Sequence, residues 1–87
     1  LEKGFVKAFN RLVMDRDKHM ERWQQMMSDG TPLEKIRAGQ MMEAVENEPL
    51  TRFVPEIAQL VLCEVTVLGA KKYEFFFLEG SRVKVSV

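Results

Sequence analysis

The chain has 87 residues, of which 46% are hydrophobic and 30% charged, a composition typical of a folded domain and unlike that of a disordered segment. Thirteen Lys and Arg residues balance thirteen Asp and Glu residues, so the chain lacks the positive charge of an autonomous nucleic-acid-binding domain. A chain this short buries roughly 60 to 65% of its unfolded surface, which argues against a deep active-site cleft and a complete enzyme. Because no Met precedes Leu1, we expect a fragment of a longer protein.

Cys63 is the only cysteine, so an internal disulfide is impossible and a reducing, cytoplasmic compartment is expected. We expect Cys63 to be a small buried hydrophobic residue, and His19 to be solvated on a charged helix surface. Neither has the spacing of a metal site, and we expect no cofactor and no small-molecule substrate in this fragment. The longest apolar runs have four to five residues, far fewer than the roughly 20 that span a bilayer, so no membrane segment is predicted.

Apolar residues recur mostly at steps of three and four over residues 1–28, which predicts one amphipathic helix. At 1.5 Å per residue this helix would reach roughly 40 Å, longer than the core requires, so we expect it to protrude. The first half is expected to pack on the domain body through Phe5, Phe9 and Leu12. The apolar side chains expected along the protruding half are Met20, Trp23 and Met27.

A helix stop and a helix start adjoin at residues 28–34. Gly30 is expected to adopt the left-handed conformation that ends many helices. Thr31 and Glu34 then form a capping box, with Pro32 at the first helical position. The second helix is expected to end at Asn47-Glu48-Pro49. Two amphipathic helices joined by a tight turn predict a long antiparallel hairpin, so residues 1–49 form a helical arm.

The tip of this arm is predicted to bind another protein or a second copy of the chain. A two-helix arm has little body behind which to bury apolar side chains, and six Met residues suit an adaptable contact surface. Gly39, in the middle of the second helix, either lets Trp23 or Met20 approach its backbone or is a tolerated surface residue. The candidate contact residues are Trp23, Met26, Met27, Leu33 and Ile36.

Residues 50–87 are predicted to form a short third helix and a three-stranded antiparallel meander. Pro55 opens the helix, which runs to about Leu62. The periodicity then changes to that of strands at residues 64–68, 72–78 and 81–87. The fold class is therefore α+β, with the arm at residues 1–49 and the helix and meander at residues 50–87, together forming one fragment of a larger chain.

The loop between the last two strands is predicted to contain three residues, 78–80, with Gly80 left-handed in a bulge. Only this length places apolar residues opposite apolar residues. Phe76 then lies on the opposite face, where it is either a contact surface or covered by a helix. The predicted pairs are Phe75 with Val83, Tyr73 with Val85, Glu74 with Lys84, and Phe76 with Arg82.

Basic residues gather in the strand region, where they are suited to phosphate contact. Protection of a free strand edge is the competing explanation. The candidate DNA-contact residues are Lys71, Lys72, Arg82 and Lys84.

The order of these segments resembles the C-terminal region of large serine recombinases, the phage integrases and mobile-element resolvases of low-GC Gram-positive bacteria. The resemblance covers nearly the whole chain. It rests on the helix of residues 1–12 with Asp15-Arg16-Asp17, the charged hairpin, Leu50 to Phe53, and the strands Val65-Thr66-Val67 and Phe75-Phe76-Phe77-Leu78-Glu79-Gly80.

The resemblance implies a parent protein that exchanges DNA strands through a serine nucleophile in a separate N-terminal domain. It also implies an upstream zinc ribbon that binds DNA, and a coiled-coil arm that pairs subunits, a role that falls on the hairpin of this chain. Neither the nucleophile nor the zinc ligands match any residue here. The alternative is a stand-alone interaction or oligomerisation module of a regulator.

Overall fold

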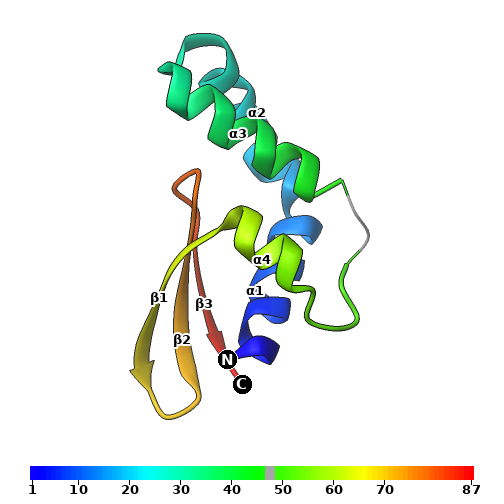
Figure 1. The fold of residues 1–87 in the computed structure, drawn as a ribbon, viewed down its shortest axis with the longest axis vertical. Helices are drawn as coiled ribbons and strands as arrows, with labels where there is room; N and C mark the ends of the chain where they lie inside the picture. Colours follow the sequence, from blue (N-terminus) through cyan, green and yellow to red (C-terminus); the bar gives the residue numbers. More distant parts are fainter. Residues whose placement is uncertain (47–48) are drawn as a thin grey trace.

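The computed structural model describes residues 1–46 and 49–87, in which helices precede a small sheet (Figure 1). The α+β class is confirmed. The predicted helix stop at Asn47 and Glu48 lies outside the described residues, and the second helix of the hairpin ends earlier, at Ala44. The helices are α1 (Glu2–Met14), α2 (Arg16–Asp29), α3 (Pro32–Ala44) and α4 (Pro55–Val61), and the strands are β1 (Leu62–Gly69), β2 (Lys72–Phe77) and β3 (Arg82–Ser86).

The three strands form an antiparallel sheet in the order β1-β2-β3, which confirms the meander. The three-residue loop is also confirmed, because the Phe77 N–H donates to the Ser81 carbonyl at 2.8 Å across residues 78–80. Gly80 has φ of 102°, the positive value expected of it. The pairs in place are Phe75 with Val83, Tyr73 with Val85, Glu74 with Lys84, and Phe76 with Arg82.

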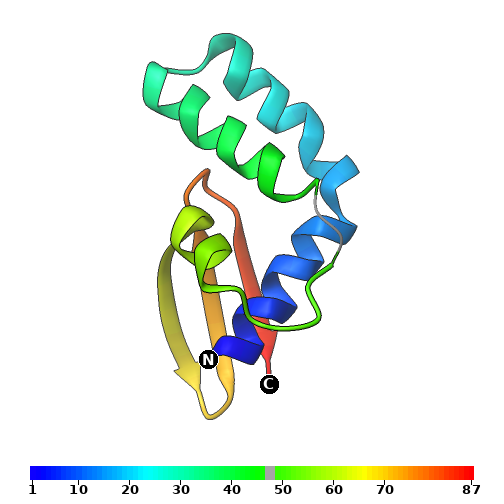
Figure 2. The ribbon, with the colours of Figure 1, turned by 45° about the vertical axis from the view of Figure 1, so that its right-hand side comes forward.

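Helix α1 packs on one face of the sheet, over β2 and β3 (Figure 2). Gly4 permits this close approach, since a Cβ there would lie 3.1 Å from the Phe75 ring. Phe5 is at the centre, with its ring centroid 5.8 Å from that of Phe53 and 6.2 Å from those of Phe75 and Phe77. As predicted, the α1 residues that face the body are buried: Phe5, Phe9 and Leu12.

The prediction of one continuous helix over residues 1–28 is wrong, because the chain breaks between α1 and α2 at Asp15. Asp15 has φ of −99° and ψ of 13°, between the helical and extended regions. Asp has low helix propensity, since its side chain competes for nearby backbone groups. The chain therefore changes direction at Asp15, and the hairpin consists of α2 and α3 alone, about half the predicted length.

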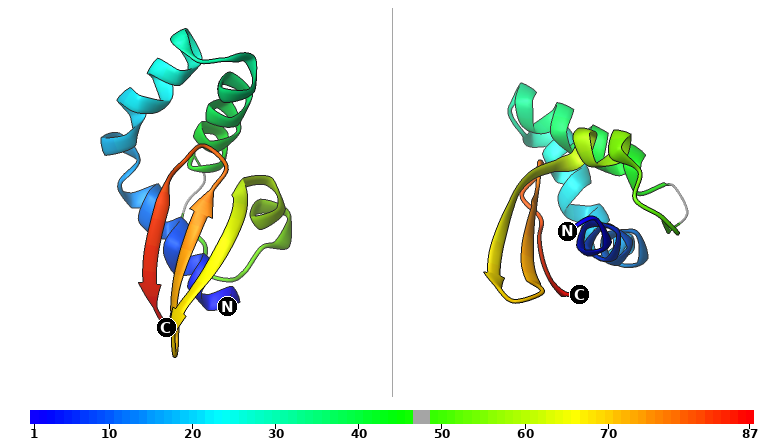
Figure 3. Two further views of the ribbon diagram at one scale, coloured as in Figure 1. Left: turned by 90° about the vertical axis from the view of Figure 1, so that its left-hand side faces the viewer. Right: turned by 60° about the horizontal axis from the view of Figure 1, so that its bottom comes forward.

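The hairpin α2–α3 lies beyond one end of the sheet (Figure 3). Its capping box is confirmed: the Thr31 N–H donates to Glu34 Oε1 at 3.1 Å, and the Glu34 N–H donates to Thr31 Oγ1 at 3.2 Å. The bond from the Thr31 N–H, and secondarily the side-chain bond with Thr31, lower the pKa of Glu34. Gly30, however, is extended, with φ of −74°, and not left-handed.

Cys63 is exposed, and its expected burial is wrong. The register of β1 against β2 shifts between Leu62 and Glu64, so Cys63 is the extra residue of an irregularity at the start of the strand. Such a residue has no paired neighbour and lies outside the inward and outward alternation of the sheet.

Candidate functional site

Three of the five predicted contact residues lie exposed on the hairpin α2–α3, and we call them the tip patch: Met27, Leu33 and Ile36. Their exposed fractions are 43%, 54% and 58%. On α3, Leu33, Ile36 and Gly39 follow one another at steps of three residues. This spacing places all three on one side of the helix. The Met27 sulfur lies 3.6 Å from where a Cβ of Gly39 would be, so Gly39 accommodates Met27, and not Trp23 or Met20. The tip patch therefore consists of exposed apolar side chains from both helices of the hairpin.

Trp23 is fully buried, so its assignment to an exposed contact surface is wrong. It points toward the loop between β2 and β3 and belongs to the main core. The His19 ring, half-buried, stacks on it with 5.3 Å between centroids. Met26 is half-buried and packs against the same core, so it is also turned away from the tip patch. On α2, Trp23 and Met26 therefore face the body of the protein, whereas Met27 faces the solvent.

Trp23 is held by a polar cluster that the sequence did not predict, the Glu79 cluster of Arg22, Trp23, Glu79 and Ser81. The Trp23 indole Nε1 donates to Glu79 Oε2 at 2.6 Å, and Arg22 Nη2 donates to the same oxygen at 2.7 Å. The Ser81 backbone N–H donates to Glu79 Oε1 at 3.0 Å. The Glu79 side chain is completely buried, whereas 43% of the Arg22 side chain is exposed. One carboxylate therefore joins α2 to the loop after β2.

The signal for this cluster was present in the sequence but ambiguous. A buried Trp needs an acceptor for its N–H, and a charged residue in a tight turn is an unusual candidate because most such residues are solvated. The sequence placed Glu79 only in the predicted loop of residues 78–80. Its role depends on the hairpin folding back over the loop, which local spacing does not encode.

The four predicted DNA-contact residues are all exposed. Strand alternation places Lys72, Arg82 and Lys84 on the sheet face opposite α1, while Lys71 lies in the turn between β1 and β2 with φ of 59°. Half-buried Glu74 lies directly opposite Lys84 and reduces the local positive charge.

The structure adds two basic residues from α1 to this region. Lys7 Nζ donates to the Ser86 carbonyl at 2.8 Å, and Arg11 Nη1 donates to the Lys84 carbonyl at 2.8 Å, so both reach the free edge of β3. These two side chains protect the β3 edge, because they occupy its carbonyls. We call the resulting set the basic strip: Lys7, Arg11, Arg82 and Lys84.

Phe76 lies on the same outer face of the sheet and is half-buried. The Arg82 guanidinium lies 5.3 Å from its ring centroid, a cation–π arrangement between cross-strand neighbours. The Phe76 ring is therefore partly shielded by a side chain of the adjacent strand. No helix of the described residues packs on it, and it is not a fully open aromatic surface.

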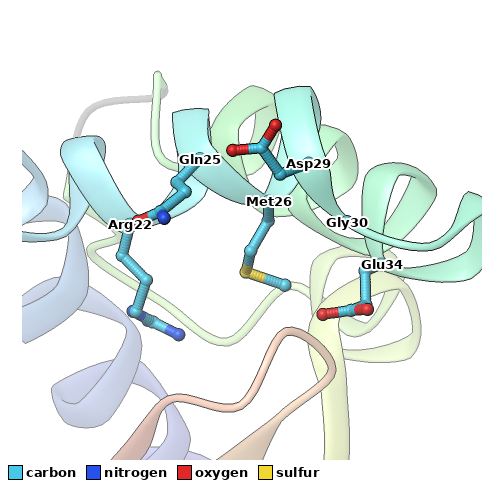
Figure 4. A pocket seen from close by; sticks show the side chains of 6 residues that line it. All are labelled: Arg22, Gln25, Met26, Asp29, Gly30 and Glu34. Carbon is cyan, nitrogen blue, oxygen red and sulfur yellow. The ribbon is translucent and has the colours of Figure 1, made fainter.

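A hollow of about 260 Å³ lies beneath the hairpin, lined by Arg22, Gln25, Met26, Asp29, Gly30 and Glu34 (Figure 4). Two of its three charged residues already have structural roles, because Arg22 binds Glu79 and Glu34 caps α3. Within residues 1–46 and 49–87, no three His, Cys, Asp or Glu side chains gather as metal ligands, so the described residues do not fit a zinc site. No helix in that part of the chain has the length and apolar character needed to cross a membrane.

Comparison of the chain with protein-family models, with curated proteins and with solved structures finds no significant match.

Proposed function

We propose that this chain is an accessory C-terminal segment of a site-specific DNA recombinase, acting on DNA in the bacterial cytoplasm. In this proposal the hairpin α2–α3 contacts a second subunit, and the strand region lies near DNA that an upstream zinc ribbon of the parent protein binds. The chain itself carries out no chemistry, and catalysis belongs to a serine nucleophile elsewhere in the parent.

The observation that carries the proposal is the exposed tip patch. Met27, Leu33 and Ile36 are exposed apolar side chains on the hairpin, near the turn that joins α2 to α3. A second copy with the same hairpin offers a matching apolar surface, as isologous contacts require. The burial of Trp23 and Met26 narrows the proposed contact to these three residues.

The basic strip supports a position close to DNA. If its four side chains each neutralised one phosphate, their contribution to affinity would fall about a hundredfold between about 50 and about 200 mM salt. The remaining charge of the chain is balanced, so we expect DNA binding to depend on the upstream domain of the parent.

The complete gene product provides the test. We expect bound zinc, salt-dependent binding to its DNA site, and a salt slope reduced by about two in the double variant Arg82→Gln/Lys84→Gln. The matched control is Lys18→Gln, an exposed cation on α2 outside the strip. Absence of both zinc and DNA binding would refute the recombinase proposal and favour the interaction module of a regulator.

The tip patch is tested separately, by sedimentation of the complete gene product on DNA. Ile36→Lys places a charge in the patch and is expected to weaken subunit pairing by about tenfold without unfolding α3, because Ile36 is exposed. The control is Leu60→Lys, an exposed apolar residue of α4. Equal pairing by both variants and the unmodified protein would exclude the patch as the contact.

A further inference from the structure

The two edges of the sheet differ sharply in how they are protected. At the β3 edge, Lys7 and Arg11 donate hydrogen bonds to the Ser86 and Lys84 carbonyls, so side chains already occupy acceptors that a new strand would use. At the β1 edge, no side chain among residues 1–46 and 49–87 forms a hydrogen bond with the backbone of residues 63–69. Natural proteins usually block such an edge with Lys, Pro or a covering segment. β1 has none of these within its eight residues.

The helix-side face of β1 is also uncovered. Helix α1 packs over β2 and β3, and α4 reaches β1 only at its start, so β1 is the strand furthest from α1 (Figure 1). Val65 lies opposite buried Phe75 and is half-buried, but Val67, one step further out on the same face, is 67% exposed. Leu68 is 49% exposed. Beyond Val65, both the backbone edge and the apolar side chains of this strand are therefore exposed.

An apolar depression adjoins this strand. It has a volume of about 240 Å³ and extends the face of β1 toward the N-terminal turn of α1. Its lining is almost entirely apolar: Leu1, Glu2, Phe5, Phe53, Ala58, Leu62, Val65 and Phe75. A strand added beside β1 would also cover part of this surface.

We propose that β1 pairs antiparallel with β1 of a second copy, centred on Thr66, to form a continuous six-stranded sheet. This register places Val65 opposite the partner's Val67 on the inner face, and Thr66 opposite the partner's Thr66 on the outer face. Glu64, the only charged residue of β1, falls opposite the partner's Leu68, so no like charges meet. The self-complementarity of the strand is what identifies a second copy as the occupant.

This interface is independent of the tip patch. The hairpin lies beyond the other end of the sheet from the turn between β1 and β2 (Figures 1 and 3). A two-fold axis through Thr66 leaves the tip patch and the basic strip of both copies free. The chain would then have two self-associating surfaces of different kinds, a backbone edge and an apolar helix face.

A charge exchange at Thr66 tests the pairing and its register. Thr66 is exposed and central, so Thr66→Arg or Thr66→Glu alone places like charges opposite each other and should weaken dimerisation of the 87-residue chain by about tenfold in sedimentation equilibrium. An equimolar mixture of the two variants should recover the affinity of the unmodified chain as a heterodimer. Failure of the mixture to recover would overturn the register. Glu74 lies opposite Thr66 on β2, so circular dichroism must first show that each variant is folded.

Val67→Lys gives a second, independent test at an exposed position. It should also weaken dimerisation, whereas Leu60→Lys on α4 and Ile36→Lys in the tip patch should leave the β1 pairing unchanged. An unmodified chain that stays monomeric up to about 1 mM would overturn the proposal, and the occupant would then be a strand of another protein. Dimerisation abolished by Ile36→Lys but unaffected by Val67→Lys would also overturn it, and would assign self-association to the tip patch.

Discussion

The interior of the body and the joint between the body and the hairpin are stabilised by different sets of interactions. In the body, Phe5 lies among four other Phe rings, and α1 approaches the sheet through Gly4. The hairpin contributes Trp23 and Met41 to the same apolar core, and its joint to the body also depends on hydrogen bonds to one buried carboxylate, Glu79. Apolar packing tolerates the loss of single contacts in proportion to area, whereas a buried polar cluster fails when one member is removed. The hairpin should therefore detach without unfolding the body.

The largest expected effect is in the body. Phe5→Ala removes a fully buried ring from the centre of the aromatic core and should lower the free energy of unfolding by about 4 kcal/mol, a large part of the stability of a small domain. Urea denaturation monitored by circular dichroism measures it. The control is Phe76→Ala on the outer face, where the ring is only half-buried and the loss should be much smaller. Equal losses would show that the core is not centred on Phe5.

The next effect separates the two regions. Glu79→Ala leaves the Trp23 N–H and the Ser81 N–H without their acceptor and removes the ion pair of Arg22, which keeps the Glu79 carbonyl and Ser81 Oγ as acceptors, and should cost about 3 kcal/mol. Hydrogen exchange should show that the amides of α2 and α3 lose protection while those of α1, β2 and β3 keep most of theirs.

Two variants bracket this result. Glu79→Gln keeps a carbonyl acceptor and should lose less than Glu79→Ala, while Glu74→Ala, a carboxylate removed from the outer face, should cost about 0.5 kcal/mol. Uniform loss of protection across the whole chain in Glu79→Ala would contradict the idea that the hairpin detaches alone.

A smaller effect is expected in the loop that presents Glu79. Gly80 has φ of 102°, so Gly80→Ala should cost about 1 to 2 kcal/mol through backbone strain, although the nearest atom to the new methyl group, an Arg22 nitrogen, is 3.7 Å away. Thermal unfolding measures this. Gly69→Ala is the matched control, because its φ is not positive and nothing lies within 4 Å of a Cβ there. Gly69→Ala should leave stability unchanged or slightly increased.

The sequence predicted local features far better than the joint between the two regions. The loop at residues 78–80 followed from the side chains it brings opposite each other, and the capping box followed from Thr31, Pro32 and Glu34, which are neighbours in the chain. The break at Asp15 was not predicted, because α1 and α2 have separate packing partners that periodicity does not reveal.

The burial of Trp23 was missed for a related reason. Its acceptor, Glu79, is 56 residues away in the chain. The sequence predicted a free arm with little body behind its tip, so Trp23 was placed on its surface. Only the fold of α2 over the β2–β3 loop brings the two side chains together. Of the five predicted contact residues, Met27, Leu33 and Ile36 remain exposed because they face away from that loop.

The smallest effect lies at the end of the hairpin, furthest from the body. Thr31→Ala removes the hydroxyl that accepts the Glu34 N–H and should cost about 1 kcal/mol, confined to the first turn of α3. Because the pKa of Glu34 is lowered in the folded state, the capping contribution is present above the ordinary pKa of Glu and is lost as the pH falls through the folded value. The protection factor of the Thr31 amide, measured by NMR hydrogen exchange, should fall over that range in the unmodified chain. A Thr31 amide whose exchange shows only the intrinsic pH dependence would contradict the reciprocal bond.

The Thr31→Ala variant also connects the stability of the hairpin end to its proposed function. Leu33 and Ile36 lie in the first turns of α3, so fraying there should weaken contacts made by the tip patch.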